Sequence, residues 1–318
     1  MKRKMEKSEL IFKIIAYVFL IVFALMCVYP FIYALSSSFS STEAVDGGQV
    51  ILWPVGFQTT AYEFVFGDNV FWISYANTLF LAFVGTIWCM LYSIMGAYAL
   101  SKKRLMGRRV FNFILVFTMW FSAGIVPQFL NYQATGDILA ALGGTTYAEM
   151  DQKWLIIIAM GMNATNVILL RNSFEGVPAE IEEAARIDGA TEMQVLMNVY
   201  IPMSKATIAT VALFFGISRW NGYFWAMRMM PNQRFSWPVQ VYIRNFIDSY
   251  SGLITEVIEG NEWEYSIKTI RPGYEHTDVS VMSVVYTMVI CAVIPILCIY
   301  PFIQKYFAKG VNMGGVKE

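Results

Sequence analysis

The stretch that organises this chain reads Glu183-Ala184-Ala185-Arg186-Ile187-Asp188-Gly189 and continues to Tyr200-Ile201-Pro202. It is polar, interrupted by glycine and net acidic, and it lies between two long apolar runs. A soluble helix–turn–helix held between two membrane spans is what a membrane protein needs if a soluble partner is to move it. The rest of the sequence bears on this interpretation.

The composition is that of a membrane protein. Of the 318 residues 57% are hydrophobic and 14% are charged, which is too apolar for an ordinary soluble domain. Each of six apolar runs is near the roughly 20 residues that a helix needs to cross about 30 Å of hydrocarbon. The first run exceeds the roughly 7–15 apolar residues of a signal peptide, so we expect an uncleaved span. We predict an all-α membrane protein with one transmembrane domain over residues 1–318 and spans at about 14–35, 78–100, 110–130, 154–170, 206–227 and 279–302.

The positive charges predict the orientation. Sixteen Lys and Arg residues fall in the N-terminus, the 101–109 hairpin, the 171–205 loop and the C-terminal tail, against five in the segments on the other side. Because Lys and Arg concentrate in cytoplasmic loops, both termini are expected in the cytoplasm. The 171–205 loop is then cytoplasmic, and the segments 36–72, 131–153 and a long loop at about 231–278 are external.

Several kinds of chemistry are missing from the sequence. Gly310 and Gly315 have the glycine spacing of a Walker A loop, but Val316-Lys317 follow instead of Lys-Ser or Lys-Thr. The single histidine, His276, excludes histidine-based catalysis and His-rich metal sites. The predicted spans contain no Asp or Glu, although proton-driven carriers normally carry ionisable residues at membrane depth. We therefore expect no catalytic residue, metal or cofactor in this chain, no nucleic-acid partner, and an energy source elsewhere.

The 171–205 loop has the signals of two short helices. Pro178 suits a first helical turn, and Glu180, Glu182 and Glu183 place negative charge at the positive end of the helix dipole. Gly189 can close the first helix in a left-handed conformation. Thr191 and Gln194 form a capping box for the second helix, which Pro202 is expected to end, and Ser204 is placed to cap the fifth span.

The charge of this loop separates two interpretations. One is an amphipathic connector lying on the lipid headgroups. However, six acids outnumber Arg171 and Arg186, whereas interfacial helices favour Lys and Arg beside the anionic cytoplasmic leaflet. We therefore expect the loop to dock into a protein cleft.

At these residues the sequence resembles the EAA loop of type I ABC importer permeases. That pattern is Glu-Ala-Ala, three residues, Gly, nine residues and Ile-x-Leu-Pro; this chain has Val199 for Ile and Ile201 for Leu. The longer phrase from Pro178 to Pro202 is similar to the carbohydrate-uptake branch, the maltose and oligosaccharide permeases. The resemblance extends to Trp220-Asn221 and to the tail around Lys305-Tyr306-Phe307.

The resemblance implies a transport subunit that is not itself an enzyme. Its partners would be a second homologous permease subunit, two cytoplasmic ATPases that carry ATP and Mg²⁺, and an extracytoplasmic solute-binding protein, in a bacterial cell membrane. The EAA helices would sit in clefts on the ATPases and transmit their closure to the spans. The residues expected to dock on the ATPases are Glu183, Ala184, Ala185, Arg186, Asp188, Gly189 and Pro202.

Candidate residues of a substrate path lie in three spans. Aromatic rings stack on sugar faces, and Asn offers both a donor and an acceptor to hydroxyls. The alternatives are an aromatic belt for Tyr223 and Trp225, helix–helix bonding for the asparagines of the fourth span, and a side chain that snorkels to the outer interface for Arg219. The candidates are Arg219, Trp220, Asn221, Tyr223, Asn163, Asn166 and Asn77.

The external loop carries a further candidate surface. It holds eight aromatic residues, a number that suggests either contact with the binding protein or a self-packed cap over the pore mouth: Phe235, Trp237, Tyr242, Phe246, Tyr250, Trp263, Tyr265 and Tyr274. The sequence thus predicts an oligosaccharide importer subunit. Import of a non-sugar solute is the first alternative, and a membrane-embedded enzyme or scaffold is the second.

Overall fold

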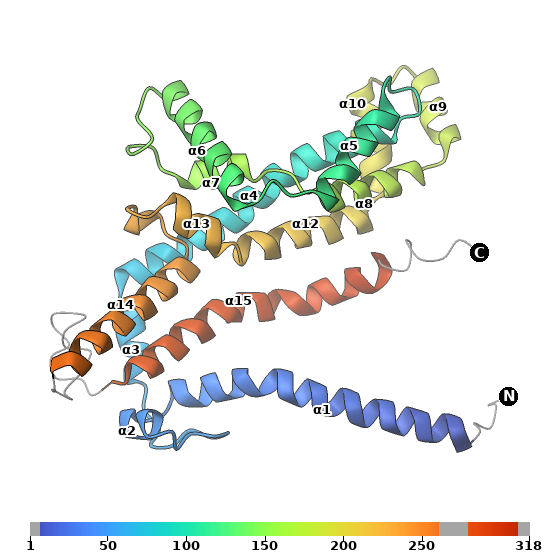
Figure 1. Cartoon of the computed structure of the whole chain (residues 1–318). Helices are drawn as coiled ribbons and strands as arrows, with labels where there is room; N and C mark the ends of the chain where they lie inside the picture. The colour runs from blue at the N-terminus through green and yellow to red at the C-terminus, as the bar shows by residue number, and fades with distance from the viewer. Residues whose placement is uncertain (1–6, 261–278, 311–318) are drawn as a thin grey trace. The chain divides into compact units, whose positions relative to one another are not determined.

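The structure is a computed structural model that describes residues 7–260 and 279–310, and every regular element in these residues is helical (Figure 1). The fold divides into two compact units, one formed by residues up to Phe71 with Ile243–Ile294 and the other by Trp72–Tyr242 with the segment from Pro295. The prediction of one transmembrane domain over residues 1–318 stays a prediction. Of the external aromatic residues, Trp263, Tyr265 and Tyr274 lie outside the described residues, as does His276.

The first unit packs around the C-terminal end of its longest helix, α1. It contains α1 (Lys7–Ser38), α2 (Thr42–Asp46), α3 (Thr60–Phe66), most of α14 (Val239–Gly260) and the first half of α15 (Val281–Gly310). A small core of Ala44, Val45 and Val50 packs against Tyr33 and Tyr286, whose rings meet edge to face at 5.6 Å. The Ser280 hydroxyl donates to Asp46 over 2.5 Å, which ties the start of α15 to α2.

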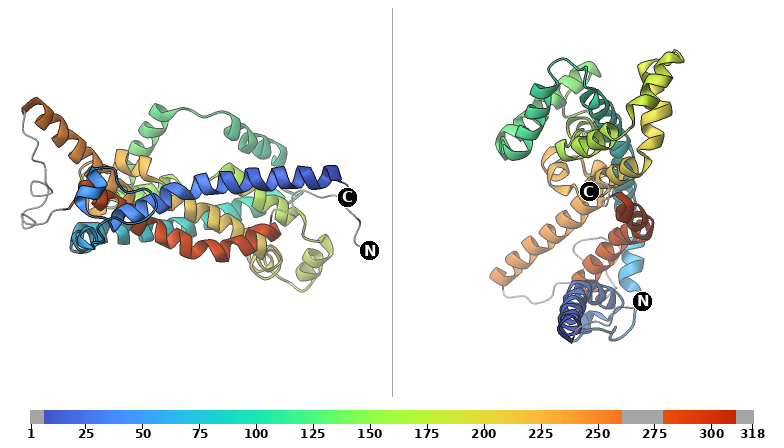
Figure 2. Two further views of the ribbon diagram at one scale, coloured as in Figure 1. Left: turned by 90° about the horizontal axis from the view of Figure 1, so that it is seen from below. Right: turned by 90° about the vertical axis from the view of Figure 1, so that its right-hand side faces the viewer.

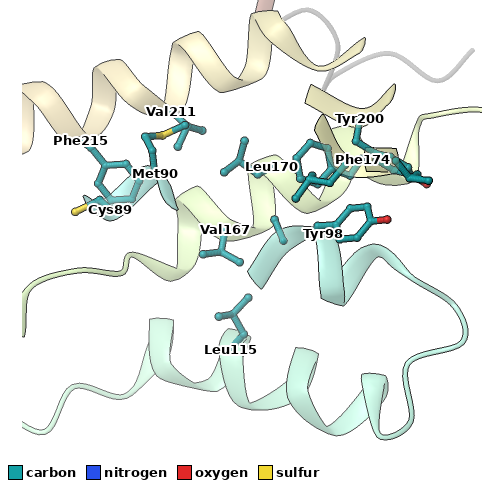
Figure 3. Packing of buried hydrophobic residues seen from close by; sticks show 13 residues of the cluster. Cys89, Met90, Tyr98, Leu115, Val167, Leu170, Phe174, Tyr200, Val211 and Phe215 are labelled. Carbon is teal, nitrogen blue, oxygen red and sulfur yellow. The ribbon is translucent and has the colours of Figure 1, made fainter. Parts of the chain in front are cut away.

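The second unit holds most of the helices. These are α4 (Asn69–Ser101), α5 (Arg108–Trp120), α6 (Ile125–Leu142), α7 (Lys153–Ala159), α8 (Ala164–Glu175), α9 (Ala179–Ile187), α10 (Glu192–Val195), a π-helix (Leu196–Tyr200), α11 (Ile201–Met203), α12 (Lys205–Trp220), α13 (Tyr223–Met229) and a 3₁₀ turn (Arg234–Ser236). Figure 3 shows the core in which α4, α5, α8 and α12 meet, with Val167, Leu170 and Val211 almost fully buried. This core holds the two helices that flank the polar 176–204 segment.

In the described part of the chain three helices are long and apolar enough to cross a membrane: Ser8–Ser38, Asn69–Ser101 and Val281–Pro301. They contain the predicted spans 14–35, 78–100 and nearly all of 279–302. Two bent pairs qualify if each counts as one span, Lys153–Ala159 with Ala164–Glu175, bent by 49°, and Glu192–Met203 with Lys205–Trp220, bent by 88°. The described residues therefore hold three to five candidate spans, in keeping with a multi-pass membrane protein.

The predicted third span, 110–130, is not one helix. α5 ends at Trp120, and α6 begins at Ile125 after Gly124, whose φ of +88° breaks the helix. Pro127 then lies in the first turn of α6, where a missing N–H costs nothing. α6 continues to Leu142, well into the segment expected to be an external loop.

The predicted fourth and fifth spans are also interrupted. The fourth is two helices separated by residues 160–163, because the Asn163 side chain caps α8 by accepting from the Asn166 N–H. The fifth ends as α12 at Trp220 and resumes as α13 at Tyr223. Each break lies beside a polar residue that the sequence had placed within a continuous helix.

The polar segment has the two predicted helices. α9 follows Pro178, Gly189 has a φ of +81°, and both halves of the capping box between Thr191 and Gln194 are present. The helix ends at Met203, one residue after Pro202. The cap expected at Ser204 is absent, because the Ser204 hydroxyl makes no cap bond and is buried without a hydrogen-bond partner among the described residues. In Figures 1 and 2, α9 and α10 lie at one end of the second unit and α6 and α7 lie toward the other.

Candidate coupling and translocation sites

The predicted docking residues form an open surface. Glu183, Ala184, Asp188, Gly189 and Pro202 are exposed, and Ala185 and Arg186 are half-buried. An apolar side chain stands out among them, because Ile187 at the end of α9 is 87% exposed. An exposed isoleucine next to carboxylates is a surface that a protein partner can cover.

Glu182, on the opposite side of this surface, is the centre of a polar cluster. Its carboxylate lies 2.8 Å from Lys102 Nζ, accepts from Arg186 Nη2 at 2.6 Å and accepts from the Tyr200 hydroxyl at 2.5 Å. Burial alone raises the pKa of Glu182, but the bonds from Lys102, Tyr200 and Arg186 outweigh burial and lower it to about 2. The carboxylate is therefore a fixed negative charge in the cell.

Lys102 is buried against two aromatic rings. Its side chain is 9% exposed, and Nζ lies 4.2 Å from the ring centre of Tyr98 and 3.9 Å from that of Tyr200. Desolvation lowers the pKa of Lys102, whereas the ion pair with Glu182 opposes that shift. The cation thus sits between one carboxylate and two ring faces, which is a favourable site for an ammonium group.

Two further carboxylates of the segment are paired. Glu192 bonds Arg104 and lies 2.9 Å from Arg186, and Glu175 bonds Arg108. Together with the Lys102–Glu182 pair, these pairs attach three residues of the basic 102–108 hairpin, Lys102, Arg104 and Arg108, to the acidic segment. The segment therefore carries less free negative charge than its six acids and two arginines predict. Within the described residues Glu180, Glu183 and Asp188 remain outside any ion pair.

A cavity of about 450 Å³ lies within the second unit, where the breaks of the predicted fourth and fifth spans face each other. Asn163, Thr165, Asn166, Ser218 and Gln240 give it a polar lining. Tyr132 and Trp220 add aromatic surface, and the remaining wall is largely apolar. Among the described residues that line it, Arg219 is the only charged one.

Arg219 turns its guanidinium into this wall. Nη1 donates to the Ile156 carbonyl at 2.9 Å, and Nη2 donates to the Met160 carbonyl and to the Cys89 sulfur, 3.1 Å away. The two carbonyls belong to the C-terminal end of α7, where backbone acceptors have no helical partner and the dipole favours a cation. Within the described residues the charge is thus accommodated by backbone carbonyls and a sulfur, without an acidic side chain.

Gly85 makes room for that side chain. A Cβ on Gly85 would lie 3.2 Å from Arg219 Cδ and Nε, closer than most real contacts. α4 therefore meets α12 at a position where only hydrogen leaves the arginine undisturbed.

The other predicted path residues separate into two groups. Asn166 lines the cavity, is only 6% exposed, and its side chain makes no hydrogen bond within the described part of the chain. Asn77 donates to the Phe235 and Trp237 carbonyls at 2.7 and 3.2 Å, outside the cavity lining. Asn221 and Tyr223 are exposed and also lie outside that lining.

A sequence profile described as "Binding-protein-dependent transport system inner membrane component" matches residues 93–313. The chain belongs to this family. The match covers α9, the Glu182 cluster and most of the cavity wall. Family members are permease components of ABC importers and work with a separate ATPase and a solute-binding protein.

Individual relatives of this permease agree over nearly the whole chain. It is 34% identical to the polygalacturonan/rhamnogalacturonan transport system permease protein YtcP of Bacillus subtilis, over 96% of this chain and 98% of that protein. It is 30% identical to Protein LplC of the same organism, over 91% and 88%. A chain in the crystal structure of a bacterial ABC transporter involved in the import of the acidic polysaccharide alginate has 40% identity and a TM-score of 0.81, with 96% of this chain and all of that chain covered. The type I permease fold expected from the EAA loop is confirmed.

Sequence reasoning missed several residues of both sites in this permease. Lys102 had been counted only as a topology charge, and its aromatic surroundings come from positions 98 and 200. Tyr132 and Gln240 reach the cavity from distant segments, and no local pattern marks them. Only the breaks leave a sequence trace, because Gly124 and Asn163 are typical of helix ends.

Proposed function

We propose that this chain is a permease subunit through which an oligosaccharide with acidic units enters a bacterial cell. The cargo comes from an extracytoplasmic binding protein, and the work comes from two ATPases that hold ATP and Mg²⁺. A second homologous permease subunit completes the pore. The proposed topology has six membrane passages with both termini in the cytoplasm of a bacterial plasma membrane.

The observation that carries the proposal is the lining of the cavity. Asparagine and glutamine amides and hydroxyl groups suit sugar hydroxyls, and the rings of Tyr132 and Trp220 suit sugar faces. A cation without a lining carboxylate gives the cavity a positive potential, which favours an anionic cargo over a neutral one. The relatives support the same class, because alginate is acidic and polygalacturonan is a polymer of a uronic acid.

The residues of the path are proposed with different roles. Asn166 offers its free amide to the sugar, while Asn163 and Trp220 shape the cavity wall. Arg219 contributes charge and holds the broken span, because most of its donors are already used. Asn221, Tyr223 and Asn77 are proposed for other points of the path.

The coupling surface is proposed from exposure and charge. Glu183, Ala184, Asp188, Gly189 and Pro202 are open to a partner, and Ala185 and Arg186 support them from α9. Movement of α9 reaches the cavity through the helices that flank it, since α8 ends just before the segment and α12 begins just after it.

The test uses the complete importer in proteoliposomes. Uptake of a short oligogalacturonide is compared with that of a neutral malto-oligosaccharide of equal length, with ATP hydrolysis measured alongside. We expect the acidic cargo to be preferred by about tenfold or more, the equivalent of roughly 1.4 kcal/mol. Equal uptake would reject the acidic cargo, and stimulation only by a non-sugar solute would reject the sugar.

A further inference from the structure

The hairpin between α4 and α5 holds a feature that docking of α9 alone does not require. Lys102 directly follows Ser101, the last residue of α4, and its ammonium group contacts Glu182 in the middle of α9. It also lies over Tyr200, which belongs to the segment that leads into α12. One buried cation therefore joins three elements: the end of α4, the middle of α9 and the end of the π-helix that leads toward α12.

This contact differs from the other ion pairs of the hairpin. The side chains of Arg104 and Glu192 are 55% and 50% exposed, and pairs of that kind contribute little. Lys102 and Glu182 are only 9% and 18% exposed. Desolvation cancels much of the stability that a buried pair provides, but the pair fixes geometry, and removing one partner leaves an uncompensated charge. Lys102 is thus suited to holding a relative position.

The position that it holds extends to the cavity. From Leu81 to Ser101, α4 runs for about 30 Å without a break. Leu81 lines the cavity, and Gly85 contacts the Arg219 side chain. A displacement of α9 that is passed to Lys102 therefore arrives at the same wall as a displacement passed through α12.

We propose that Lys102 is a positioning residue that makes the 102–108 hairpin part of the coupling device, so that α4 moves together with α9. The proposal rests on the coupling role proposed for α9. It adds a non-covalent route to the covalent connections of α9 with α8 and α12. Without this contact α4 does not follow the movement of α9, and the part of the cavity wall on α4 does not move together with the part on α12.

The experiment follows the cavity directly and does not depend on the cargo. The assembled importer carries Thr165→Cys, an exposed position in the cavity lining, in a chain whose four own cysteines are replaced by serine. The measurement is the change in the rate of thiol labelling when Mg-ATP is added. It is made for Lys102→Met, Lys102→Arg and the matched control Arg104→Met, with subunit assembly and ATP hydrolysis recorded for each.

We expect Lys102→Met to lose most of the nucleotide-dependent change in labelling, by about tenfold, while the complex assembles and hydrolyses ATP. Lys102→Arg should recover most of the change, because a guanidinium keeps the charge and stacks on rings. Arg104→Met should stay within about twofold of wild type, as exposed pairs do. If Lys102→Met does not assemble, Glu182→Gln provides the same test, since it keeps the shape and removes the charge.

The contrary results are distinct. A wild-type change that survives intact in Lys102→Met or Glu182→Gln overturns the role of Lys102. An equal loss in Arg104→Met does so too, because it would make the effect one of hairpin stability. If Mg-ATP does not change the labelling rate in the wild type, the coupling function proposed for α9 is rejected, and the role proposed for Lys102 is rejected with it.

Discussion

At the scale of single residues, Arg219 shows how a charge is kept within an apolar helix. Its partners are backbone carbonyls at the end of α7 and a cysteine sulfur. Among the described residues no acidic partner takes part, because the broken span provides backbone acceptors that no helix uses. The carbonyls that the break between α7 and α8 leaves without a helical donor are thereby hydrogen-bonded by a residue of α12.

Substitution of Arg219 should impair transport more than assembly. In Arg219→Ala two carbonyls lose their donor and the cavity loses its charge, so we expect transport to fall by at least about tenfold with ATP hydrolysis retained. Arg219→Lys should recover only part of it, because an ammonium group lacks the planar fork. Uptake by proteoliposomes measures both, and full transport by Arg219→Ala would show that the residue has neither role.

Gly85 gives an independent measure of the same wall. Gly85→Val should push the Arg219 side chain out of place and lower transport several-fold, whereas Gly96→Val in the same helix should not, because a Cβ on Gly96 meets nothing within 4 Å. Labelling of Thr165→Cys reports the shape of the cavity in both variants. Equal transport in the two variants would contradict the close approach of α4 to Arg219.

The ion pair between Lys102 and Glu182 should be lost at low pH. The pKa of Glu182 is depressed in the folded chain to about 2 from 4.5, so its contribution is complete above about pH 4.5 and is lost as the pH falls toward 2. A pair of spin labels at exposed positions 103 and 180 should move apart in that range. In Glu182→Gln the two labels should be apart at every pH. A label-to-label distance that does not change with pH in the wild type would show that the Lys102–Glu182 ion pair does not hold the hairpin on α9.

At the scale of elements, the local signals around Gly189 predicted the structure, whereas the cap expected at Ser204 is absent and the distant contacts were not predicted. Gly189, Thr191 and Gln194 predicted the pair α9 and α10, because caps and turns depend on neighbours within four residues. The same sequence did not reveal the distant partners of Lys102 and Arg219, which lie about 60 to 130 residues away. Hydropathy also passed over the breaks at residues 121–124 and 160–163, since apolar residues flank both and a running average does not register a cap.

Gly189 should matter through its backbone. Its φ of +81° is one that an L-residue adopts only with strain, so Gly189→Ala should cost on the order of 1 kcal/mol in the α9–α10 turn and weaken ATPase binding. Gly189→Pro should do more, because it also removes the N–H that donates to the Arg186 carbonyl at 3.0 Å. Gly143→Ala is the control, a helix-ending glycine with a φ of −82°. Binding of purified ATPase to nanodiscs ranks the three, and a Gly143→Ala effect as large as that of Gly189→Ala would remove the conformational explanation.

At the scale of the whole molecule, the two units differ in what they expose: the first unit exposes the apolar helix α1, and the second carries the coupling surface and the cavity. The most apolar stretch of α1 has no residue buried against the described residues, whereas the corresponding stretches of α4 and α15 have 28% and 33% of their residues buried. Such a helix needs lipid or another subunit around it. The second unit carries both the coupling surface and the cavity, so the parts that must communicate are the parts that share a core.

The same scale includes the proposed topology, which two matched positions can test. Leu142 is 81% exposed at the end of α6, in the segment expected outside, and Ile187 is 87% exposed at the end of α9, in the segment expected inside. In a chain without its own cysteines, Leu142→Cys should react with a membrane-impermeant thiol reagent in intact spheroplasts, while Ile187→Cys should react only in inverted vesicles stripped of ATPase. Because both side chains are equally open, a difference in labelling reports the side of the membrane and not burial. Labelling of Ile187→Cys from outside would invert the orientation that the positive charges predict, and labelling of both positions from the same side would show that α5 and α6 do not complete a passage.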